Sequence, residues 1–314
     1  MSDRSDAPNP LRELSPVVFV NCEAGGDRTR RYLPQIQELF DSSRLDVEFV
    51  ITQSMEHLES CARDAINANH RLLVAMGGDG TFQGLVNASF GADVLLGILP
   101  SGGGNDLAAA LELPRNPLKA AEAMLRSRAR RIDMVRVRTA DGRTRLYAGG
   151  GGAGLDAEAV LYASGPYRRL PSRFRYIASA LRALAGFAPL NIQIDFPGGD
   201  LPPHQGRALL VAVLNTPSYG GGLRLAPQAA LDDGLLNIVM VEDLGKISVL
   251  GLLPRLIGSG ELHTSRVKRW LSPRVRLTTD RPCFFQGDGE IIGPAPVEIE
   301  ALPLAIQVLA PVTK

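Results

Sequence analysis

The stretch that decides the fold is Arg71–Ala88, which reads RLLVAMGGDGTFQGLVNA. The residues RLLVAM predict a buried strand, GGDGT predicts a tight turn, and the apolar spacing from Gly80 to Ala88 predicts an amphipathic helix. Glycines let backbone N–H groups approach phosphate oxygens, and the start of a helix favours negative charge. A strand, a glycine turn and a helix in this order therefore favour a phosphate-binding site.

Two polar residues within this turn could add to phosphate binding. Thr81 can supply a hydroxyl donor, and Asp79 could reach a magnesium ion or its water ligands. No lysine follows the glycines, so the turn is not the GxxxxGK[ST] phosphate loop. The alternative interpretation is a purely structural strand-to-helix turn with Asp79 as the helix cap.

A second glycine turn follows in Leu99–Leu111, LPSGGGNDLAAAL, again between a predicted strand and a helix. Asn105 and Asp106 are good helix-capping residues, which is their alternative, structural role. Turns that follow neighbouring parallel strands meet at one edge of the sheet. We expect both turns to converge on one crevice, which favours a nucleotide.

The first third of the chain alternates between predicted strands and helices. This alternation predicts an α/β domain with a parallel sheet covered by helices on both faces. The strands are predicted at Pro16–Asn21, Leu45–Thr52, Arg71–Met76 and Val94–Leu99, and the helices at Arg30–Phe40, Met55–Ala68 and Gly80–Ala88.

The character changes after Pro117–Arg130, a stretch that we expect to be helical and basic. Short predicted strands separated by turns then favour a β-rich antiparallel sandwich. We expect residues 11–131 to form the α/β domain and residues 132–304 to form the β-rich domain. Gly149–Gly154 (GGGGAG) is predicted to be a loop.

Composition narrows the class of protein. A chain of 314 residues with 45% hydrophobic residues favours two globular domains, and a net charge of +1 gives no argument for nucleic acid. Cys22, Cys61 and Cys283 lack metal-ligand spacing and are expected to be free thiols of a reducing compartment. Met1–Pro10 lacks the apolar core of a secretory signal, and no run of about 18 apolar residues predicts a membrane-spanning helix. A cytoplasmic location is expected, with peripheral membrane association left open.

The two glycine turns resemble those of the diacylglycerol kinase catalytic family, which reads approximately GGDGT followed by PxGTGNDxA. The resemblance continues in order through Pro16–Pro311. It is carried by RRIDMVRV around Asp133, GGAGLDAEAV at Gly151–Val160, YGGGLRLAPQAALDDGLLNIVMV at Tyr219–Val241 and FFQGDGEIIGPAPVEIEALPLAIQVLAP at Phe284–Pro311.

This resemblance implies a lipid kinase of phospholipid metabolism that uses ATP and Mg²⁺, with its active site in the cleft between the two domains. It also implies that the first domain is a Rossmann-like nucleotide-binding domain, completed by a C-terminal strand within residues 305–314. The acceptor at the membrane surface would be diacylglycerol, a sphingoid base or ceramide, or another bacterial-type lipid. Two alternatives stay open: an enzyme of the NAD kinase type, and a non-catalytic lipid-binding protein that retains the fold. Homodimer formation is also left open.

The resemblance further implies which residues contact the nucleotide. The family has a threonine where this chain has Gly103, so one hydroxyl contact is missing and backbone amides would have to compensate. The implied nucleotide contacts are Thr52, Gly77, Gly78, Asp79, Gly80, Thr81, Gly102, Gly103, Gly104, Asn105 and Asp106.

The acidic positions of the family also have counterparts here. Asp288 or Glu290 would be the general base that deprotonates the lipid hydroxyl. Asp233, with the carbonyl groups of Ala230 and Leu235, would hold a structural magnesium ion, an oxygen-only set that suits a hard cation. Asp133 would join the water network of the catalytic magnesium ion, together with Asp79.

Two basic segments allow either membrane contact or ordinary solvated surface. Tyr167–Arg175 (YRRLPSRFR) leads into a predicted helix with Phe174, Ile177, Leu181 and Leu184 on one face. Val267–Leu271 (VKRWL) places Trp270 beside two cationic residues, as interfacial segments often do.

Overall fold

The computed structural model describes residues 10–25, 27–167, 172–199, 201–246, 248–251 and 264–311. The chain divides into two compact units, which are described separately. Unit 1 comprises the chain up to Gly102, Leu111–Arg130 and the residues from Gln307 onward. Unit 2 comprises Gly103–Ala110 and Arg131–Ile306.

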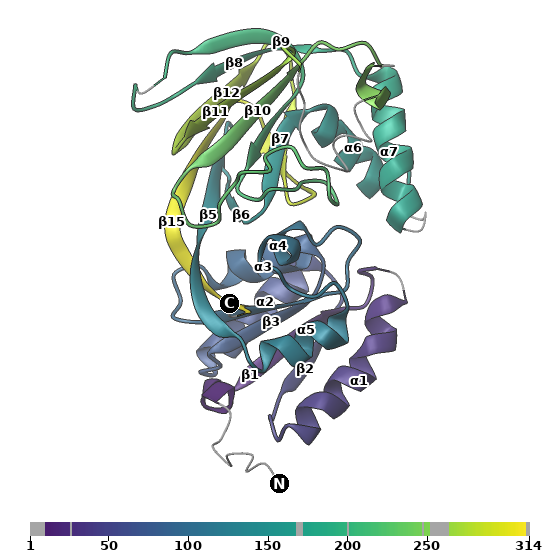
Figure 1. Ribbon diagram of the computed structural model, residues 1–314, viewed down its shortest axis with the longest axis vertical. Helices are drawn as coiled ribbons and strands as arrows, with labels where there is room; N and C mark the ends of the chain where they lie inside the picture. Colours follow the sequence, from purple (N-terminus) through teal and green to yellow (C-terminus); the bar gives the residue numbers. More distant parts are fainter. Residues whose placement is uncertain are drawn as a thin grey trace. The chain divides into compact units, whose positions relative to one another are not determined.

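Unit 1 is a parallel sheet with helices on both faces, as the alternating pattern predicts (Figure 1). The strand order is β15-β4-β3-β1-β2, and each neighbouring pair is parallel. Its elements are η1 (Pro10–Leu14), β1 (Pro16–Asn21), α1 (Arg28–Ser42), β2 (Glu48–Thr52), α2 (Met55–Asn67), β3 (Leu72–Gly77), α3 (Asp79–Ser89), β4 (Leu95–Pro100), α5 (Pro117–Met124) and the last residues of β15 (Val297–Ala310).

Packing in unit 1 explains why the central strands are continuous apolar runs. Every residue of β3 is buried, because α1 and α5 pack together on one side and α2 and α3 contact each other on the other. Ile36 and Phe40 of α1 and Met124 of α5 share a core with the strands. The expected α/β class is confirmed for this part of the chain.

Unit 2 is β-rich and largely antiparallel, as expected. Its main strand path is β14-β13-β7-β9-β8-β12-β15, with β10 and β11 added beside β9, and β5 and β6 beside β15. Its elements are α4 (Asp106–Ala110), β5 (Arg128–Thr139), β6 (Thr144–Tyr147), β7 (Gly150–Gly154), α6 (Leu155–Ser164), α7 (Ser172–Gly186), β8 (Leu190–Asp195), β9 (His204–Leu214), β10 (Leu236–Glu242), β11 (Val267–Ser272), β12 (Arg274–Thr279), β13 (Phe284–Gly287), β14 (Glu290–Pro294) and β15 as far as Ile306.

Two secondary-structure predictions were wrong. The glycine run predicted as a loop contains β7, a fully buried strand between β9 and β13. The stretch Pro117–Arg130 is helical only as far as Met124, and β5 begins at Arg128. Both errors arise because pairing with distant strands overrides local propensity.

The structure places the side chains of the two basic segments differently. Trp270 lies on β11 and packs against Phe196 and His204, with ring centroids 6.0 and 4.9 Å apart, so its ring contributes to the core of unit 2. In α7, Leu184 is buried whereas Leu181 is 48% exposed, so these two do not share one buried face. Arg168–Pro171 and the side chains of Phe174 and Ile177 lie outside the described residues.

Cys22, Cys61 and Cys283 are free thiols, as expected. Among the described residues, no helix is long and apolar enough to cross a membrane.

Candidate functional site

The first glycine turn joins β3 to the start of α3. The carbonyl of Gly78 accepts the N–H groups of Thr81 and Phe82, which closes the first helical turn. The N–H groups that precede them have no intrahelical acceptor by geometry, so a helix start can bind an anion. A Cβ at Gly77 would lie 2.2 Å from the Thr81 hydroxyl oxygen, so only glycine fits there. Thr81 itself is buried, at 4% exposure.

The second glycine turn is hydrogen-bonded to the first. The carbonyl of Gly77 accepts the N–H groups of Ser101 at 2.9 Å and of Gly102 at 3.1 Å. A Cβ on Gly78 would come within 3.4 Å of the Gly102 Cα. The backbones of the two turns are therefore in contact.

Asn21, which the sequence analysis did not single out, also belongs to this cluster. Its Nδ2 donates to the Thr81 hydroxyl at 3.1 Å, and its strand partner is Thr52, whose own hydroxyl donates to the Val20 carbonyl at 3.2 Å. Because Asn21 supplies one hydrogen to the Thr81 oxygen, the Thr81 O–H remains a donor. The available signal was a polar residue ending a buried strand at the carboxyl edge of the sheet.

The segment after β1 completes the cluster. The Thr29 hydroxyl, which is fully buried, lies 2.7 Å from the Ser101 hydroxyl and 2.9 Å from the Ala24 carbonyl. Gly25 has φ of +67° and lies against the Ser101 carbonyl so closely that a Cβ would lie 1.8 Å from its oxygen. The carboxyl ends of β2, β3 and β4 thus carry the predicted nucleotide residues of unit 1, and Asn21 at the end of β1 is hydrogen-bonded to one of them.

The end of the second turn, which belongs to unit 2, is bound to another glycine-rich loop. The carboxylate of Asp106 accepts the Ser218 hydroxyl and the Gly221 N–H, both at 2.7 Å. Gly103 and Gly104 are exposed, whereas Asn105 has φ of +60° and is buried at 9% exposure. Asp106 therefore fixes the loop that begins the YGGGL block.

Asp288 forms a hairpin turn and ties it to the neighbouring strand. Asp288 and Gly289 both have positive φ, 48° and 84°, as the favoured two-residue hairpin turn requires. The Asp288 carboxylate accepts the N–H groups of Ala148, Gly149 and Gly150 at 2.9–3.0 Å. Such charge-assisted bonds indicate a strong structural role for this carboxylate.

A second group, missed from the sequence, holds the same turn from its other side. The Gln286 side chain accepts the Gly289 N–H at 3.0 Å and donates to Asp156 at 3.1 Å and to the Tyr219 hydroxyl. Tyr219 in turn donates to Asp156. Desolvation raises the pKa of the Asp156 carboxyl, and hydrogen bonds from Tyr219 and Gln286 oppose that rise.

Glu290 follows this turn at the start of β14, with its side chain exposed. Desolvation by the surrounding protein nevertheless raises the pKa of Glu290, and the positive charge of Arg175 opposes the rise. A carboxylate with a raised pKa is a stronger base, which suits proton abstraction.

The remaining predicted acidic residues, Asp133 and Asp233, both accept hydrogen bonds from backbone N–H groups. Both oxygens of the fully buried Asp133 accept backbone N–H groups, from Gly234 at 2.6 Å and Leu304 at 2.7 Å. Asp233 accepts the Leu235 N–H at 2.9 Å. No group of three or more His, Cys, Asp or Glu side chains able to hold a metal occurs in the described part of the chain. The oxygen-only set of Asp233, Ala230 and Leu235 still suits Mg²⁺, and its metal role stays a prediction.

Comparison with known proteins matches both parts of the chain to family models. Residues 15–137 match the diacylglycerol kinase catalytic domain, and residues 150–310, more than half of the chain, match the YegS C-terminal NAD kinase beta sandwich-like domain. The chain belongs to the diacylglycerol kinase catalytic family. The second match supports the predicted sandwich, so the fold class is confirmed in both parts.

Curated relatives of this diacylglycerol kinase family member cover most of its length. A diacylglycerol kinase of Mycobacterium tuberculosis is 29% identical over 82% of this chain and 86% of its own. One of Bacillus subtilis is 25% identical over 95% and 96%. The crystal structure of a diacylglycerol kinase from Bacillus anthracis shares the fold, with a TM-score of 0.72 at 18% identity over 95% of this chain and 97% of that one.

Proposed function

We propose that this chain is a magnesium-dependent lipid kinase that transfers the γ-phosphoryl group of ATP to a lipid hydroxyl, with diacylglycerol as the first acceptor to test. The observation that carries the proposal is the direct backbone contact between the two glycine turns, with Gly77 accepting both Ser101 and Gly102. Relatives named diacylglycerol kinase support the choice of acceptor. The proposal retains a cleft between the two domains as the place of catalysis.

On this proposal the residues of unit 1 bind and orient the nucleotide. The first N–H groups of α3 and the glycine backbone hold phosphate oxygens, and Thr81 donates its hydroxyl hydrogen. ATP with Mg²⁺ supplies the phosphoryl group and neutralises its charge when bound. Thr52 and Asn21 position this edge of the sheet, and Asp79 contributes its carboxylate to the metal side of the site.

The residues of unit 2 act on the acceptor. Glu290 removes the proton of the lipid hydroxyl, because its carboxylate follows the turn and has a raised pKa. Asp288 is assigned to hold the turn, since its carboxylate already accepts three N–H groups. Asp133 fixes the turn that carries Asp233, the proposed ligand of a structural magnesium ion.

The test is transfer of labelled phosphate from ATP to a lipid panel in mixed micelles, with magnesium and with EDTA. Diacylglycerol, sphingosine and ceramide are the acceptors. We expect labelled phosphatidic acid from diacylglycerol with magnesium only, and about 10²–10⁴-fold slower labelling with Glu290→Gln. Absence of any labelled lipid under all magnesium conditions would refute the proposal.

An enzyme of the NAD kinase type remains the second candidate, because the C-terminal family model is described as NAD kinase beta sandwich-like. This candidate predicts a water-soluble dinucleotide acceptor. Phosphorylation of NAD in the absence of lipid would favour it, whereas lipid phosphorylation without NAD phosphorylation would exclude it.

A further inference from the structure

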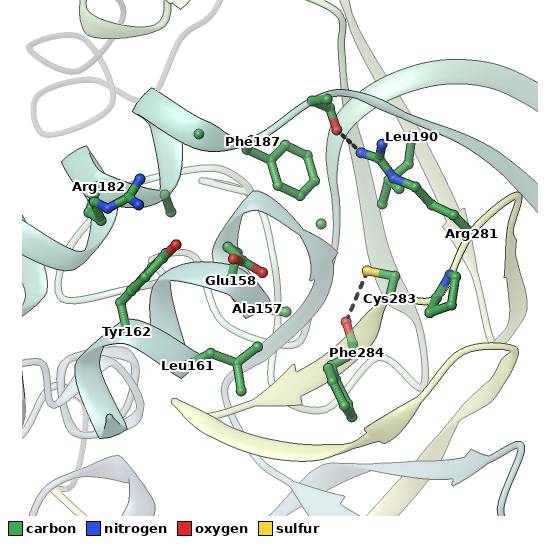
Figure 2. A pocket seen from close by; sticks show the side chains of 15 residues that line it. Ala157, Glu158, Leu161, Tyr162, Arg182, Phe187, Leu190, Arg281, Cys283 and Phe284 are labelled. Atoms are coloured by element: carbon green, nitrogen blue, oxygen red, sulfur yellow. Dashed lines mark hydrogen bonds between the residues drawn. The ribbon is translucent and has the colours of Figure 1, made fainter. Parts of the chain in front are cut away.

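A pocket of about 510 Å³ lies within unit 2, between α6, the end of α7 and the segment that leads into β13 (Figure 2). Its α6 lining includes Ala157, Glu158 and Leu161. Asp156, by contrast, points to the Gln286 network on the other side of the helix. Phe284, at the start of β13, is the part of the β13–β14 hairpin that lines the pocket, and the lining includes neither Asp288 nor Glu290. The proposed reaction assigns no role to the residues that line the pocket.

The pocket contains three charged groups of mixed sign. In the view of Figure 2, the Glu158 carboxylate lies between Arg182 and Arg281. In the part of the chain that the structure describes, Glu158 makes no ion pair with either arginine. A ligand that carries both a cation and an anion would complement all three groups.

Both arginines are held in place by aromatic rings. The Arg182 guanidinium lies 5.2 Å from the Tyr162 ring centroid, and the Arg281 guanidinium lies 5.9 Å from that of Phe187. Arg281 also donates to the carbonyl of Ala188. Guanidinium groups fixed in this way lose little freedom on binding a phosphate, and their remaining N–H groups are good phosphate donors.

Cys283 adds no charge to the pocket at neutral pH. Desolvation raises the pKa of its thiol to about 11, so the thiol stays protonated. The negative charge of the pocket lining therefore comes from the Glu158 carboxylate.

The rim of the pocket is apolar and exposed. Leu161 and Phe284 line it and are 37% and 42% exposed. Large apolar side chains beside arginines are typical of surfaces that contact lipid, where the apolar groups enter the acyl region and the cations meet phosphate.

We propose that this pocket binds the headgroup of a phospholipid that carries a phosphate and a primary ammonium group. The ammonium group donates to Glu158, a guanidinium group binds the phosphate, and the exposed rim contacts the acyl chains. The site docks the protein on such a lipid and does not depend on whether the chain is a kinase.

The test measures binding of short-chain phospholipids below their micelle concentration by calorimetry. Dihexanoyl phosphatidylethanolamine should bind about tenfold more tightly than the phosphatidylcholine and phosphatidylglycerol analogues, because a trimethylammonium group cannot donate hydrogen bonds and glycerol carries no cation. Glycerophosphoethanolamine, which lacks acyl chains, should also bind about tenfold more weakly. Equal affinities within the series, or no binding, would overturn the proposal.

Variants test the negative charge of Glu158 and the positive charges of the two arginines separately. Glu158→Gln should remove the preference for the ethanolamine lipid, whereas Arg182→Gln combined with Arg281→Gln should weaken all three phospholipids. Arg63→Gln combined with Arg276→Gln, two exposed arginines outside the pocket lining, is the control for the loss of two positive charges. Unchanged preference in Glu158→Gln, with the thermal unfolding temperature of the wild type, would contradict the assignment.

Discussion

Gln286 donates through Nε2 to a carboxylate oxygen of Asp156 at 3.1 Å, and Gln286 itself is only 1% exposed. The same amide accepts the N–H of Gly289 through its oxygen. One side chain therefore links a half-buried acid on α6 to the turn that precedes Glu290. Three blocks of the sequence resemblance, which are far apart in the chain, meet at this amide.

Gln286→Met should destabilise unit 2 and lower turnover. Methionine has a similar volume but can neither accept from Gly289 nor donate to Asp156, so buried polar groups lose partners. We expect a loss of about 1–3 kcal/mol in the free energy of unfolding, measured by urea denaturation. Gln205→Met, at an exposed position of β9, is the matched control and should change the unfolding free energy little. Equal effects of the two changes would contradict the role of the Gln286 network.

Asp288→Asn and Glu290→Gln should have opposite profiles. Asp288→Asn weakens three backbone hydrogen bonds, so its unfolding free energy should fall by about 1–3 kcal/mol. Glu290→Gln should leave the fold intact and lower kcat by about 10²–10⁴-fold, the usual contribution of a general base. Kinase assays and urea denaturation on both variants provide the readout. Full activity in Glu290→Gln would transfer the role of base to another group.

The raised pKa of Glu290 makes a prediction about stability and pH. The unfolded carboxyl ionises near pH 4.3, before the folded one, so the wild type loses stability as pH rises from that value through the folded pKa. Glu290→Gln does not ionise and should escape this loss. Its thermal unfolding temperature should match the wild type at pH 4 or below and exceed it at pH 8. A difference in unfolding temperature that does not depend on pH would argue against the raised pKa of Glu290.

The fold of unit 1 could be predicted because its signals are local. Buried apolar runs, glycine turns and amphipathic helices follow one another at short range, as in Arg71–Ala88. The strand β7 could not be predicted, because its glycines are required by close packing against residues that lie far away in the chain. Side chains from β9, β13 and the Tyr219 loop occupy the space where β-carbons would be.

The residues of the candidate site likewise include some that the sequence could identify and some that it could not. The glycine turns and the acidic residues were identifiable by type and spacing. Asn21 and Gln286 were not, because an amide at a strand end or before a turn carries no signal until its partners are known. The roles of Asp133 and Asp288 also depend on backbone N–H groups supplied by distant segments.

Gly151→Ala tests the explanation of β7. A Cβ at Gly151 would lie 2.6 Å from the Gln286 carbonyl oxygen and 2.8 Å from the Phe285 ring, which is closer than atoms can pack. We expect a destabilisation of about 1–3 kcal/mol, as for other overpacked core positions, measured by urea denaturation. Gly251→Ala is the control, because an added Cβ there meets no atom of the described residues within 4 Å. Equal stability of the two variants would contradict the close packing of β7.

Gly103→Thr tests the one departure from the family pattern within the nucleotide turns. Gly103 is exposed and has no left-handed φ, so a threonine is compatible with its backbone. If the missing hydroxyl weakens ATP binding, the variant should lower the KM for ATP by about 3–10-fold at similar kcat, which corresponds to one hydrogen bond of about 0.5–1.5 kcal/mol. Gly103→Val has the same shape without the hydroxyl and should not improve KM. An equal gain from valine would attribute the effect to backbone stiffening, and no gain from threonine would show that backbone amides already supply the contact.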